Sequence, residues 1–513
     1  MNKNRSIIYN LPIKKFDSLL DKLGIEKTWQ SVLATNLKNY GKKDLFYILE
    51  ENEFKDAKIQ EYDFIKDLSV GEISVLYEYS LAYVNRDKRK KEGQYFTPDD
   101  IAQIMAKRAA LFPKNKTWVD PCSGIGNLSF WLAKKQSDPE NFIKNNLFLI
   151  DRDELALFIA RFIFATNFQD KDKIFFNNIK ARFIVADFLE SEKLPGYDYA
   201  ILNPPYVLTK SDDRFETSQA RDLYAYFLEK IIKTTQGFVS ITPQTFTNGQ
   251  KFKSFRGLLI DNFSNIKIYC FDNVPDSIFR GIKFGSKNTN KANSTRAGII
   301  VASKKENEKS FKITPLLRWR SKDRKQFLGL IDGFLTEVNP SANIFPKIHR
   351  DFLPLYKMVE TCDKTLANFV SSSPTKYRLT VPSTPRYFIS ALKRPISRSS
   401  FKTLYFYNEQ EYNFAYLLLN SSYMYWWWRV NDGGMTISEK TLLTLPIVKN
   451  IIADKDLLSK VEKSETTNLV IKRNAGKDNE NVKHDLLLIN EINKKMFPNF
   501  ANILGKLHNN SVI

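Results

Sequence analysis

Residues 199–206 read Tyr199-Ala200-Ile201-Leu202-Asn203-Pro204-Pro205-Tyr206, which is an apolar run followed directly by an asparagine and two prolines. The apolar residues predict a buried strand. The two prolines cannot continue this strand, because each lacks an N–H group and fixes φ. An amide and an aromatic ring are therefore held at its carboxyl end, which is where ligands of open α/β sheets bind. A proline turn with no binding role would have the same local pattern.

Three segments upstream also place an acidic residue at the end of a short apolar run. We expect strands at 117–120, 147–150 and 183–186, which end at Asp120, Asp151 and Asp187, and helices at 99–111, 128–135 and 154–167. The carboxyl ends of parallel strands meet at one edge of a sheet, so these residues and Asn203 would share that edge. The pattern predicts an α/β fold with a Rossmann-like sheet.

Local chemistry points to a nucleotide-like ligand at this edge. Gly124 and Gly126 form a turn between a strand and a helix, which allows close approach of backbone N–H groups. Asp151 is placed for ribose hydroxyls or, alternatively, for capping the next helix. Asp187 and Phe188 could bind an adenine ring through the carboxylate and the aromatic face. Thr97 is expected to cap a helix whose first residue is Pro98.

These motifs, in this order, resemble the S-adenosylmethionine-dependent DNA adenine-N6 methyltransferases that have the cofactor motifs first and the target-recognition domain last. The resemblance rests on 93–98, 120–127, Asp151, Asp187-Phe188 and 203–206, with 222–227 and 297–301 as later core elements. It covers about residues 90–305 and is loose beyond them. It implies a cofactor site made of Tyr95, Thr97, Asp120, Pro121, Gly124, Asp151, Asp187, Phe188 and Asn203.

The resemblance also implies how the acceptor is held. The Asn203 side-chain oxygen and the Pro204 carbonyl would accept hydrogen bonds from the exocyclic amine of adenine, with Pro205 fixing the turn. Tyr206 would stack on a base flipped out of the duplex. Phe279 is the candidate for a second aromatic wall, with Phe284 close behind, although either could be an ordinary core residue. No metal is required by this chemistry.

The length and composition of the chain limit its domain organisation and the kinds of partner that it can bind. The 513 residues predict two or three domains, which we expect at 1–92 (helical), 93–305 (catalytic) and 306–513 (an α+β target-recognition domain with a helical tail). The net charge of +21 favours a polyanionic partner, nucleic acid first and a membrane surface second. No apolar run is long enough for a spanning helix or a signal peptide, so we expect a cytoplasmic protein. Three cysteines and three histidines are too scattered for a disulfide framework or zinc site.

Positive charge is concentrated downstream of the methyltransferase motifs. Residues 311–402 contain 17 Lys and Arg against 6 Asp and Glu. Their interleaving with aromatic residues predicts contacts with DNA, although a solvated basic face is the alternative. The run at 86–91 is either a linker or a phosphate contact, and 423–428 is expected to be core. The candidate DNA contacts are Arg318, Arg320, Arg324, Lys325, Arg378, Arg386, Lys393 and Arg394.

The sequence thus predicts a site-specific DNA adenine-N6 methyltransferase of a restriction-modification or related DNA-marking system. It would act on double-stranded DNA as a monomer, with or without a separate nuclease or specificity partner. Two alternatives stay open. One is a methyltransferase acting on RNA or on protein glutamine. The other is a DNA-specificity module with a degenerate methylase core.

Overall fold

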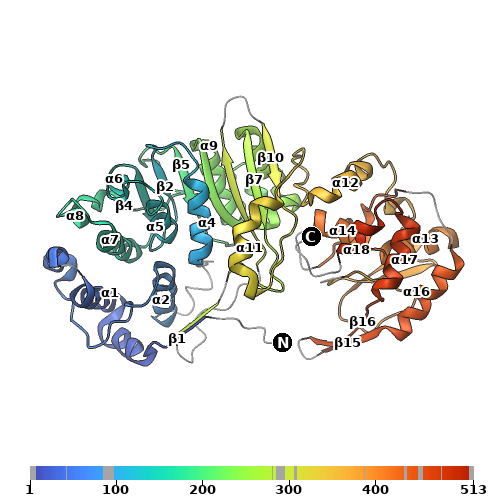
Figure 1. Ribbon diagram of the computed structural model, residues 1–513, viewed down its shortest axis with the longest axis horizontal. Coiled ribbons are helices and arrows are strands. Elements are labelled where there is room, and N and C mark those ends of the chain that lie inside the picture. The colour runs from blue at the N-terminus through green and yellow to red at the C-terminus, as the bar shows by residue number, and fades with distance from the viewer. Residues whose placement is uncertain are drawn as a thin grey trace. The chain divides into compact units, whose positions relative to one another are not determined.

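The computed structural model forms two compact units (Figure 1). The first contains Met1–Phe311 and Pro340–Asn343, and the second contains Lys312–Asn339 and Ile344–Ile513. The predicted helical and catalytic regions thus share the first unit. The structure describes residues 7–41, 43–84, 97–279, 281–284, 295–304, 309–385, 388–432, 436–448, 454–474 and 477–507.

The first unit contains neighbouring strands of one large sheet, in the order β7-β9-β6-β5-β2-β3-β4. Strands β4, β3, β2, β5 and β6 run parallel to one another, whereas β9 runs antiparallel to both β6 and β7. The predicted α/β fold with a Rossmann-like methyltransferase sheet is therefore confirmed. The strands are β2 (Trp118–Asp120), β3 (Leu147–Asp151), β4 (Phe183–Val185), β5 (Tyr199–Leu202), β6 (Gly237–Pro243), β7 (Asn265–Cys270) and β9 (Ala297–Ser303).

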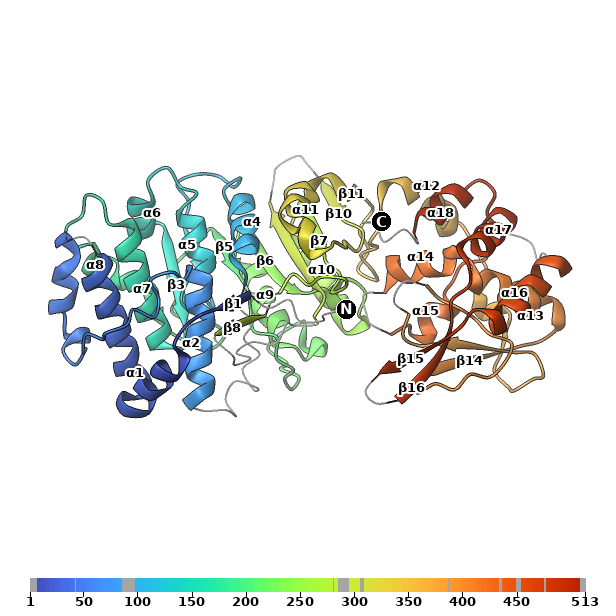
Figure 2. The ribbon, with the colours of Figure 1, turned by 60° about the horizontal axis from the view of Figure 1, so that its bottom comes forward.

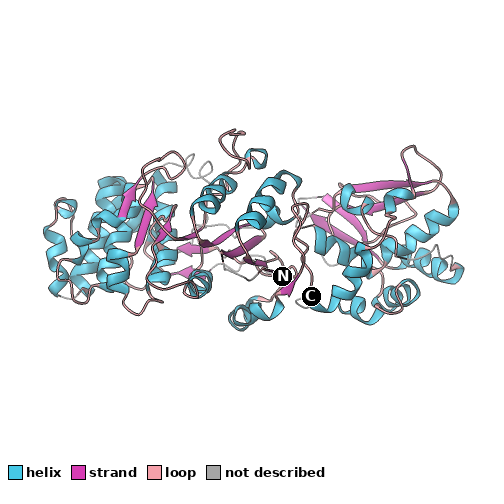
Figure 3. Ribbon diagram, turned by 90° about the horizontal axis from the view of Figure 1, so that it is seen from above, coloured by secondary structure: helices cyan, strands magenta, loops and turns pink. Residues whose placement is uncertain are grey.

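Helices cover both faces of this sheet (Figure 3). A Cβ atom at Gly237 would lie 3.0 Å from Phe112, which follows α4, whereas the ring of Phe238 lies 5.5 Å from that of Phe263, which follows α10. Successive strand residues point to opposite faces, so α4 and α10 lie on opposite sides. The helices of this region are α4 (Asp99–Ala109), α5 (Asn127–Ala133), α6 (Pro139–Asn145), α7 (Glu154–Phe168), α8 (Phe175–Asn178), α9 (Leu223–Thr234) and α10 (Lys253–Asn262).

The N-terminal helices pack against the sheet-containing core rather than standing apart from it. Helix α1 (Ile13–Tyr40) and helix α2 (Val70–Val84) lie beside α7 and α5 (Figure 2). Strand β1 (Ile7–Tyr9) pairs in parallel with β8 (Ile282–Phe284), far along the chain. The Nε1 of Trp29 donates to Ser80 Oγ over 3.0 Å and joins α1 to α2. The predicted helical region is thus an integral part of the first unit.

The second unit is an α+β assembly with its own core. Helix α14 supplies Tyr423, Trp426 and Trp428, all buried, which confirms that 423–428 is core. Strands β12 (Val370–Ser371), β14 (Phe401–Phe406) and β13 (Arg378–Pro382) form one sheet, β10 (Ser310–Ile313) pairs with β11 (Thr336–Glu337), and β15 (Leu469–Asn474) pairs with β16 (Lys477–Val482). The helices are α11 (Arg324–Leu330), α12 (Leu353–Glu360), α13 (Glu409–Asn420), α14 (Ser422–Asn431), α15 (Glu439–Leu443), α16 (Lys455–Thr467), α17 (Leu486–Met496) and α18 (Ala501–Lys506).

Within the described ranges, no helix has both the length and the apolar character needed to cross a bilayer.

One local prediction was wrong. The residue before α4 is Pro98, and no side chain caps this helix. The hydroxyl of Thr97 instead accepts a hydrogen bond from Asn203, 106 residues away. A threonine next to a helix start can use its oxygen locally or at a distance, and here the distant partner is preferred.

Arg256 of α10 ties three backbone segments of the first unit together. Its guanidinium is fully buried and donates to the carbonyls of Phe246, Gly249, Ala342 and Asn343 over 2.6–2.9 Å. Burial lowers the pKa of Arg256 to about 10, which leaves it charged at neutral pH. We expect Arg256→Met to destabilise the protein by at least about 3 kcal/mol, because four carbonyls lose a charged donor. Urea unfolding measures this, and exposed Lys253→Met on the same helix should change the free energy of unfolding by less than about 0.5 kcal/mol.

Candidate active site

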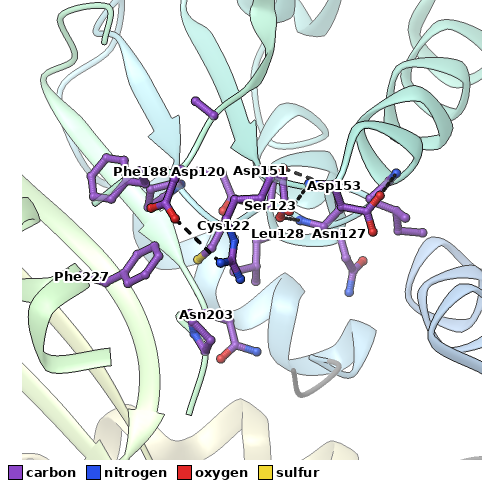
Figure 4. A pocket seen from close by; sticks show the side chains of 18 of the residues that line it. Asp120, Cys122, Ser123, Asn127, Leu128, Asp151, Asp153, Phe188, Asn203 and Phe227 are labelled. Carbon is purple, nitrogen blue, oxygen red and sulfur yellow. Dashed lines mark hydrogen bonds and ion pairs between the residues drawn. The ribbon is translucent and has the colours of Figure 1, made fainter. Parts of the chain in front are cut away.

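The predicted strand-end residues lie around one cavity of about 240 Å³. Asp120, Asp151, Asp187 and Asn203 all line it, and each follows or ends a different parallel strand. Figure 4 shows Asn203 near one end of the site, with Phe188 and Phe227 on one side and Asp153 on the other. The structure therefore places these four side chains together at one edge of the sheet, as the sequence predicts.

The amide of Asn203 is oriented by hydrogen bonds to both its nitrogen and its oxygen. Its Nδ2 donates to Thr97 Oγ1 over 2.9 Å, and its Oδ1 accepts from the Tyr206 hydroxyl over 2.7 Å. The same hydroxyl lies 3.1 Å from the Ile241 carbonyl of the neighbouring strand. An amide has an acceptor oxygen and a donor nitrogen, and these bonds fix which of the two faces Thr97 and which faces Tyr206. The site therefore presents an oriented acceptor oxygen at the end of β5.

The aromatic residues around Tyr206 only partly match the prediction. Phe279 lies beside Tyr206, with ring centroids 6.2 Å apart, but the rings meet edge to face and Phe279 is 3% exposed. Tyr224 of α9 meets Tyr206 on another side, 6.3 Å away. Phe284 packs against Tyr9 in the β1–β8 pair and is fully buried. Phe279 thus lies beside Tyr206, and its role as a second aromatic wall stays a prediction, while Phe284 belongs to the core.

The backbone of the glycine turn is hydrogen-bonded to the side chain of Asp151. Gly124 and Gly126 have positive φ, and a Cβ atom at Gly126 would lie 2.8 Å from Leu149, so this position requires glycine. Asp151 accepts from the N–H of Gly124 over 2.8 Å and from the N–H of Asp153 over 3.0 Å. The cap of α7 is Asp153, not Asp151, which removes that alternative for Asp151.

Two oxygen atoms of the cavity lining are buried without a partner among the described residues. They are Asp120 Oδ1 and Asn127 Oδ1, whereas Asp120 Oδ2 accepts from Ser129. Buried acceptors without donors are costly, so such a pair fits a ligand that brings N–H groups. Burial raises the pKa of Asp120 to about 7, against the opposing hydrogen bond from Ser129. The amine of S-adenosylmethionine, the cofactor that the resemblance implies, fits this position.

The predicted adenine platform is partly covered. Phe188 lines the cavity, but its ring stacks on Phe227 of α9 with centroids 5.6 Å apart. Lys230 Nζ lies 4.8 Å from the centroid of the Phe188 ring and donates to the Phe188 carbonyl. Asp187 faces Arg152 at 3.7 Å. An adenine ring would therefore meet an aromatic pair rather than a single phenyl face.

Sequence reasoning missed several cavity residues. Asn127 ends the glycine turn and Phe227 ends the run that begins at Asp222, so both were available from the motifs. Ser74, Tyr77 and Glu78 of α2 also line the cavity, and no motif marks them. Tyr95 and Arg386, which the sequence assigned to the cofactor and to DNA, lie outside the described residues, as do 86–91 and 285–294.

The predicted DNA contacts of the second unit divide into two groups. Arg318 and Arg324 are 4% and 3% exposed, and Arg318 donates to the Tyr425 hydroxyl over 2.8 Å. Lys393 pairs with Glu462, and Arg394 lies near Glu465 and Glu480. These four side chains serve packing and ion pairing in this structure. The exposed members of the predicted set, among the described residues, are Arg320, Lys325 and Arg378.

The pKa of Asp120 predicts how cofactor affinity changes with pH. Below about pH 7 its carboxyl is protonated, and the attraction for a cationic amine is lost. We expect the Kd for S-adenosylmethionine to fall roughly tenfold between pH 6 and pH 7.5, as the ionised fraction rises. Isothermal titration calorimetry measures this. Asp120→Asn should bind S-adenosylmethionine more weakly at pH 7.5, and its Kd should change less with pH. The change that remains in this variant measures titration of the cofactor amine itself. An unchanged profile in the variant would exclude Asp120 as the titrating group.

Part of this chain is similar to known proteins. Residues 125–279 match the family model of the Eco57I restriction-modification methylase. The type II methyltransferase M.BsuBI of Bacillus subtilis is 31% identical over 213 residues, which cover 36% of this chain and 40% of that protein. M.PstI of Providencia stuartii is 27% identical over 209 residues, which cover 36% and 39%. Among solved structures, the type IIG restriction endonuclease BpuSI matches with a TM-score of 0.46 and 11% identity, over 97% of this chain and 79% of that one.

The matches to the curated relatives thus span about 40% of the length of those proteins. The family match includes Gly126, Asp151, Asp187 and Asn203–Tyr206, whereas Asp120 and Gly124 lie just before it. The resemblance to S-adenosylmethionine-dependent DNA methyltransferases is thereby confirmed, and the part of the chain that carries the strand-end site is similar to the Eco57I restriction-modification methylase.

Proposed function

We propose that this protein is a site-specific DNA methyltransferase that transfers a methyl group from S-adenosylmethionine to the N6 amine of adenine. The observation that carries the proposal is the oriented amide of Asn203 beside the acidic cavity. The matching family is named for restriction and modification, and we extend that role to this chain.

The acceptor chemistry follows from the position of Asn203. The exocyclic amine of adenine is a weak nucleophile, because its lone pair is delocalised into the ring. Hydrogen bonds from this amine to Asn203 Oδ1 and to the Pro204 carbonyl would localise the lone pair and offset the positive charge that develops on nitrogen. The bound cofactor supplies an activated methyl group on a sulfonium. The protein then has to position the two reactants and exclude water.

The same oxygen favours a methyl acceptor that carries a hydrogen-bond donor, such as an amine, over a ring nitrogen, which carries none. Thr97 accepts from Asn203 Nδ2, which leaves Oδ1 toward Tyr206 and away from Thr97. A substrate group that binds Asn203 Oδ1 must therefore donate a hydrogen bond. Glutamine side chains and RNA bases also carry amino groups, so methylation of either is the competing activity. The exposed cations of the second unit favour a nucleic acid over a protein.

Duplex DNA hides the N6 amine of adenine, so the base would have to leave the helix. Tyr206 is half-buried and reaches the site from the turn after β5. Phe279 stands edge-on beside it at 6.2 Å, which is too close for a base to stack between the two rings. We infer that these rings separate when a base enters. Cofactor binding without DNA would leave them as they are.

Substitution of Asn203 tests the assignment of the acceptor. We expect Asn203→Ala to reduce DNA methylation by at least about 100-fold, because the amine loses its main acceptor. Cofactor binding should persist, since Asp120, Asn127 and Asp151 remain. Single-molecule sequencing of treated DNA detects N6-methyladenine and its sequence context. Wild-type protein that yields none on any duplex would overturn the proposal, and an active Asn203→Ala variant would remove Asn203 from its role.

The three exposed cations test DNA binding by the second unit. We expect the combined change of Arg320, Lys325 and Arg378 to alanine to weaken DNA binding and to lower the slope of log K against log salt by about 3. Fluorescence anisotropy with duplex DNA over a salt series measures both. The matched control removes the same charge from exposed Lys14, Lys22 and Lys38 of α1. Equal effects of both triple variants would indicate only a general electrostatic attraction.

A further inference from the structure

We propose that Leu208 is an apolar wedge that enters the DNA duplex when the target adenine leaves it, and that exposed cations around this leucine hold the neighbouring phosphates. This inference rests on the proposed function, because it takes the partner to be duplex DNA and the methyl acceptor to be a flipped adenine. It assigns a role in base flipping to residues 207–222, which we call the wedge loop.

Leu208 exposes an apolar side chain to water beside the strand-end site. It is 75% exposed and follows Tyr206 by two residues. Two residues extend at most about 7 Å, which is about two base steps along one DNA strand. If Tyr206 stacks on the flipped adenine, Leu208 lies within reach of the base stack that the adenine has left. A leucine in that place can fill the gap, because apolar side chains inserted at base steps replace lost stacking contacts.

The backbone of Leu208 is fixed although its side chain is exposed. Leu208 pairs with Asp222 in an isolated antiparallel bridge. On one side of this pair the N–H of Leu223 donates to the Val207 carbonyl over 2.9 Å, and on the other the N–H of Thr209 donates to the Arg221 carbonyl over 3.0 Å. The exposed side chain is therefore carried by a backbone that is hydrogen-bonded on both sides of it.

The rest of the wedge loop is anchored to helix α9. The buried carboxylate of Glu229 accepts from the N–H groups of Glu216 and Thr217 over 3.0 and 2.8 Å. The ring of Phe215 stacks on that of Tyr226, with centroids 4.6 Å apart. A loop held in this way loses little conformational entropy when it meets DNA, so it suits a wedge that must resist the return of the base.

Exposed cations surround Leu208. Lys210 and Arg221 belong to the wedge loop, and Lys251 belongs to the short helix Gln250–Phe252, which contacts the short helix Ser218–Ala220 of the loop. All three side chains are exposed, and none of them forms a salt bridge with any residue that the structure describes. This arrangement suits the phosphates on either side of an inserted leucine.

Arg221 also has an unusual backbone conformation. Its φ of 48° and ψ of 39° lie in the left-handed region, which residues with side chains seldom adopt. Such conformations persist where the surroundings fix them, and they are concentrated at binding sites. Arg214 of the same loop, by contrast, pairs with Glu190 and Asp212. Arg221 is thus better placed than Arg214 to bind a phosphate.

The first test measures flipping directly. Its probe is a duplex with the recognition sequence found by sequencing, in which 2-aminopurine replaces the target adenine and fluoresces more strongly when it is unstacked. We expect saturating wild-type protein with S-adenosylmethionine to raise this fluorescence. Leu208→Ala should give less than about a third of that rise, because the gap in the stack is left unfilled. Leu208→Met should restore most of the rise, since methionine supplies a similar apolar volume.

The second test measures methylation of two substrates. On the matched duplex we expect Leu208→Ala to lower kcat/KM by at least about 10-fold. On a duplex whose target adenine faces cytosine the loss should be less than about 3-fold, because a mismatched base is already easier to unstack. A fault in folding or in cofactor binding would lower methylation of both substrates alike.

The matched control is Leu111→Ala. Leu111 is 79% exposed, and its neighbour Phe112 packs near Gly237 at the start of β6, at the edge of the sheet opposite to Asn203. This variant should behave as wild type does in both tests. Arg221→Ala should lower the slope of log K against log salt by about 1. An unchanged slope would remove Arg221 from its role.

The outcomes separate this inference from the proposed function. Leu208→Ala with wild-type fluorescence, or with equal losses on the matched and mismatched duplexes, would overturn the role of Leu208 alone. Wild-type protein that methylates the duplex without raising 2-aminopurine fluorescence would also overturn the wedge and leave the methyltransferase in place. Wild-type protein that methylates no duplex would overturn both together.

Discussion

The parallel hydrogen bonding of β4, β3, β2 and β5 is the constraint on which the site depends. Each of these strands is short, and each is ended or soon followed by a polar residue whose position is set by the register of the strand with its neighbours. Because all four run in the same direction, their carboxyl ends meet at one edge. Asp120, Asp151, Asp187 and Asn203 are brought together by this arrangement alone, although they are spread over more than eighty residues of sequence.

Burial of carboxylates gives this edge its chemical character. Asp120 is 1% exposed, and the pKa of Asp151 is raised because burial outweighs the two backbone hydrogen bonds that it accepts. A folded protein tolerates such groups when a cationic ligand or a proton compensates them. S-adenosylmethionine carries an ammonium and a sulfonium. The cavity therefore combines a shape made by glycine turns with a charge that suits a positively charged nucleotide derivative.

The acceptor side of the site depends on hydrogen bonds between distant segments. Thr97 lies before α4, Asn203 lies after β5, and Ile241 belongs to β6. Tyr206 connects the last two, so the amide, the hydroxyl and the strand end form one network. Hydrogen bonds between distant segments also occur in the second unit, where Arg318 and Lys393 bond to other side chains of the protein. Other cations of this unit are exposed and could meet a polyanion.

Much of this organisation follows from the sequence by itself. The apolar run 199–202 matches β5 at both ends, and Pro204 and Pro205 explain why that strand stops. The acidic strand ends, the glycine turn and the buried Trp426 and Trp428 are also local patterns of residue type, so they can be recognised without coordinates. These patterns were sufficient to predict the α/β fold, the resemblance to DNA methyltransferases and several of the residues that line the strand-end cavity.

Other features were decided only by the tertiary structure. Thr97 pairs with Asn203 rather than capping its helix, and Arg318 and Arg324 are buried although basic residues near aromatic ones usually suggest a nucleic-acid surface. Glu78 reaches the cofactor cavity from a helix that no motif marks. In each case the partner lies far away in sequence. The local pattern of residue types indicates which helix, strand or turn a residue belongs to. The packing of those elements determines which groups, distant in sequence, its side chain contacts.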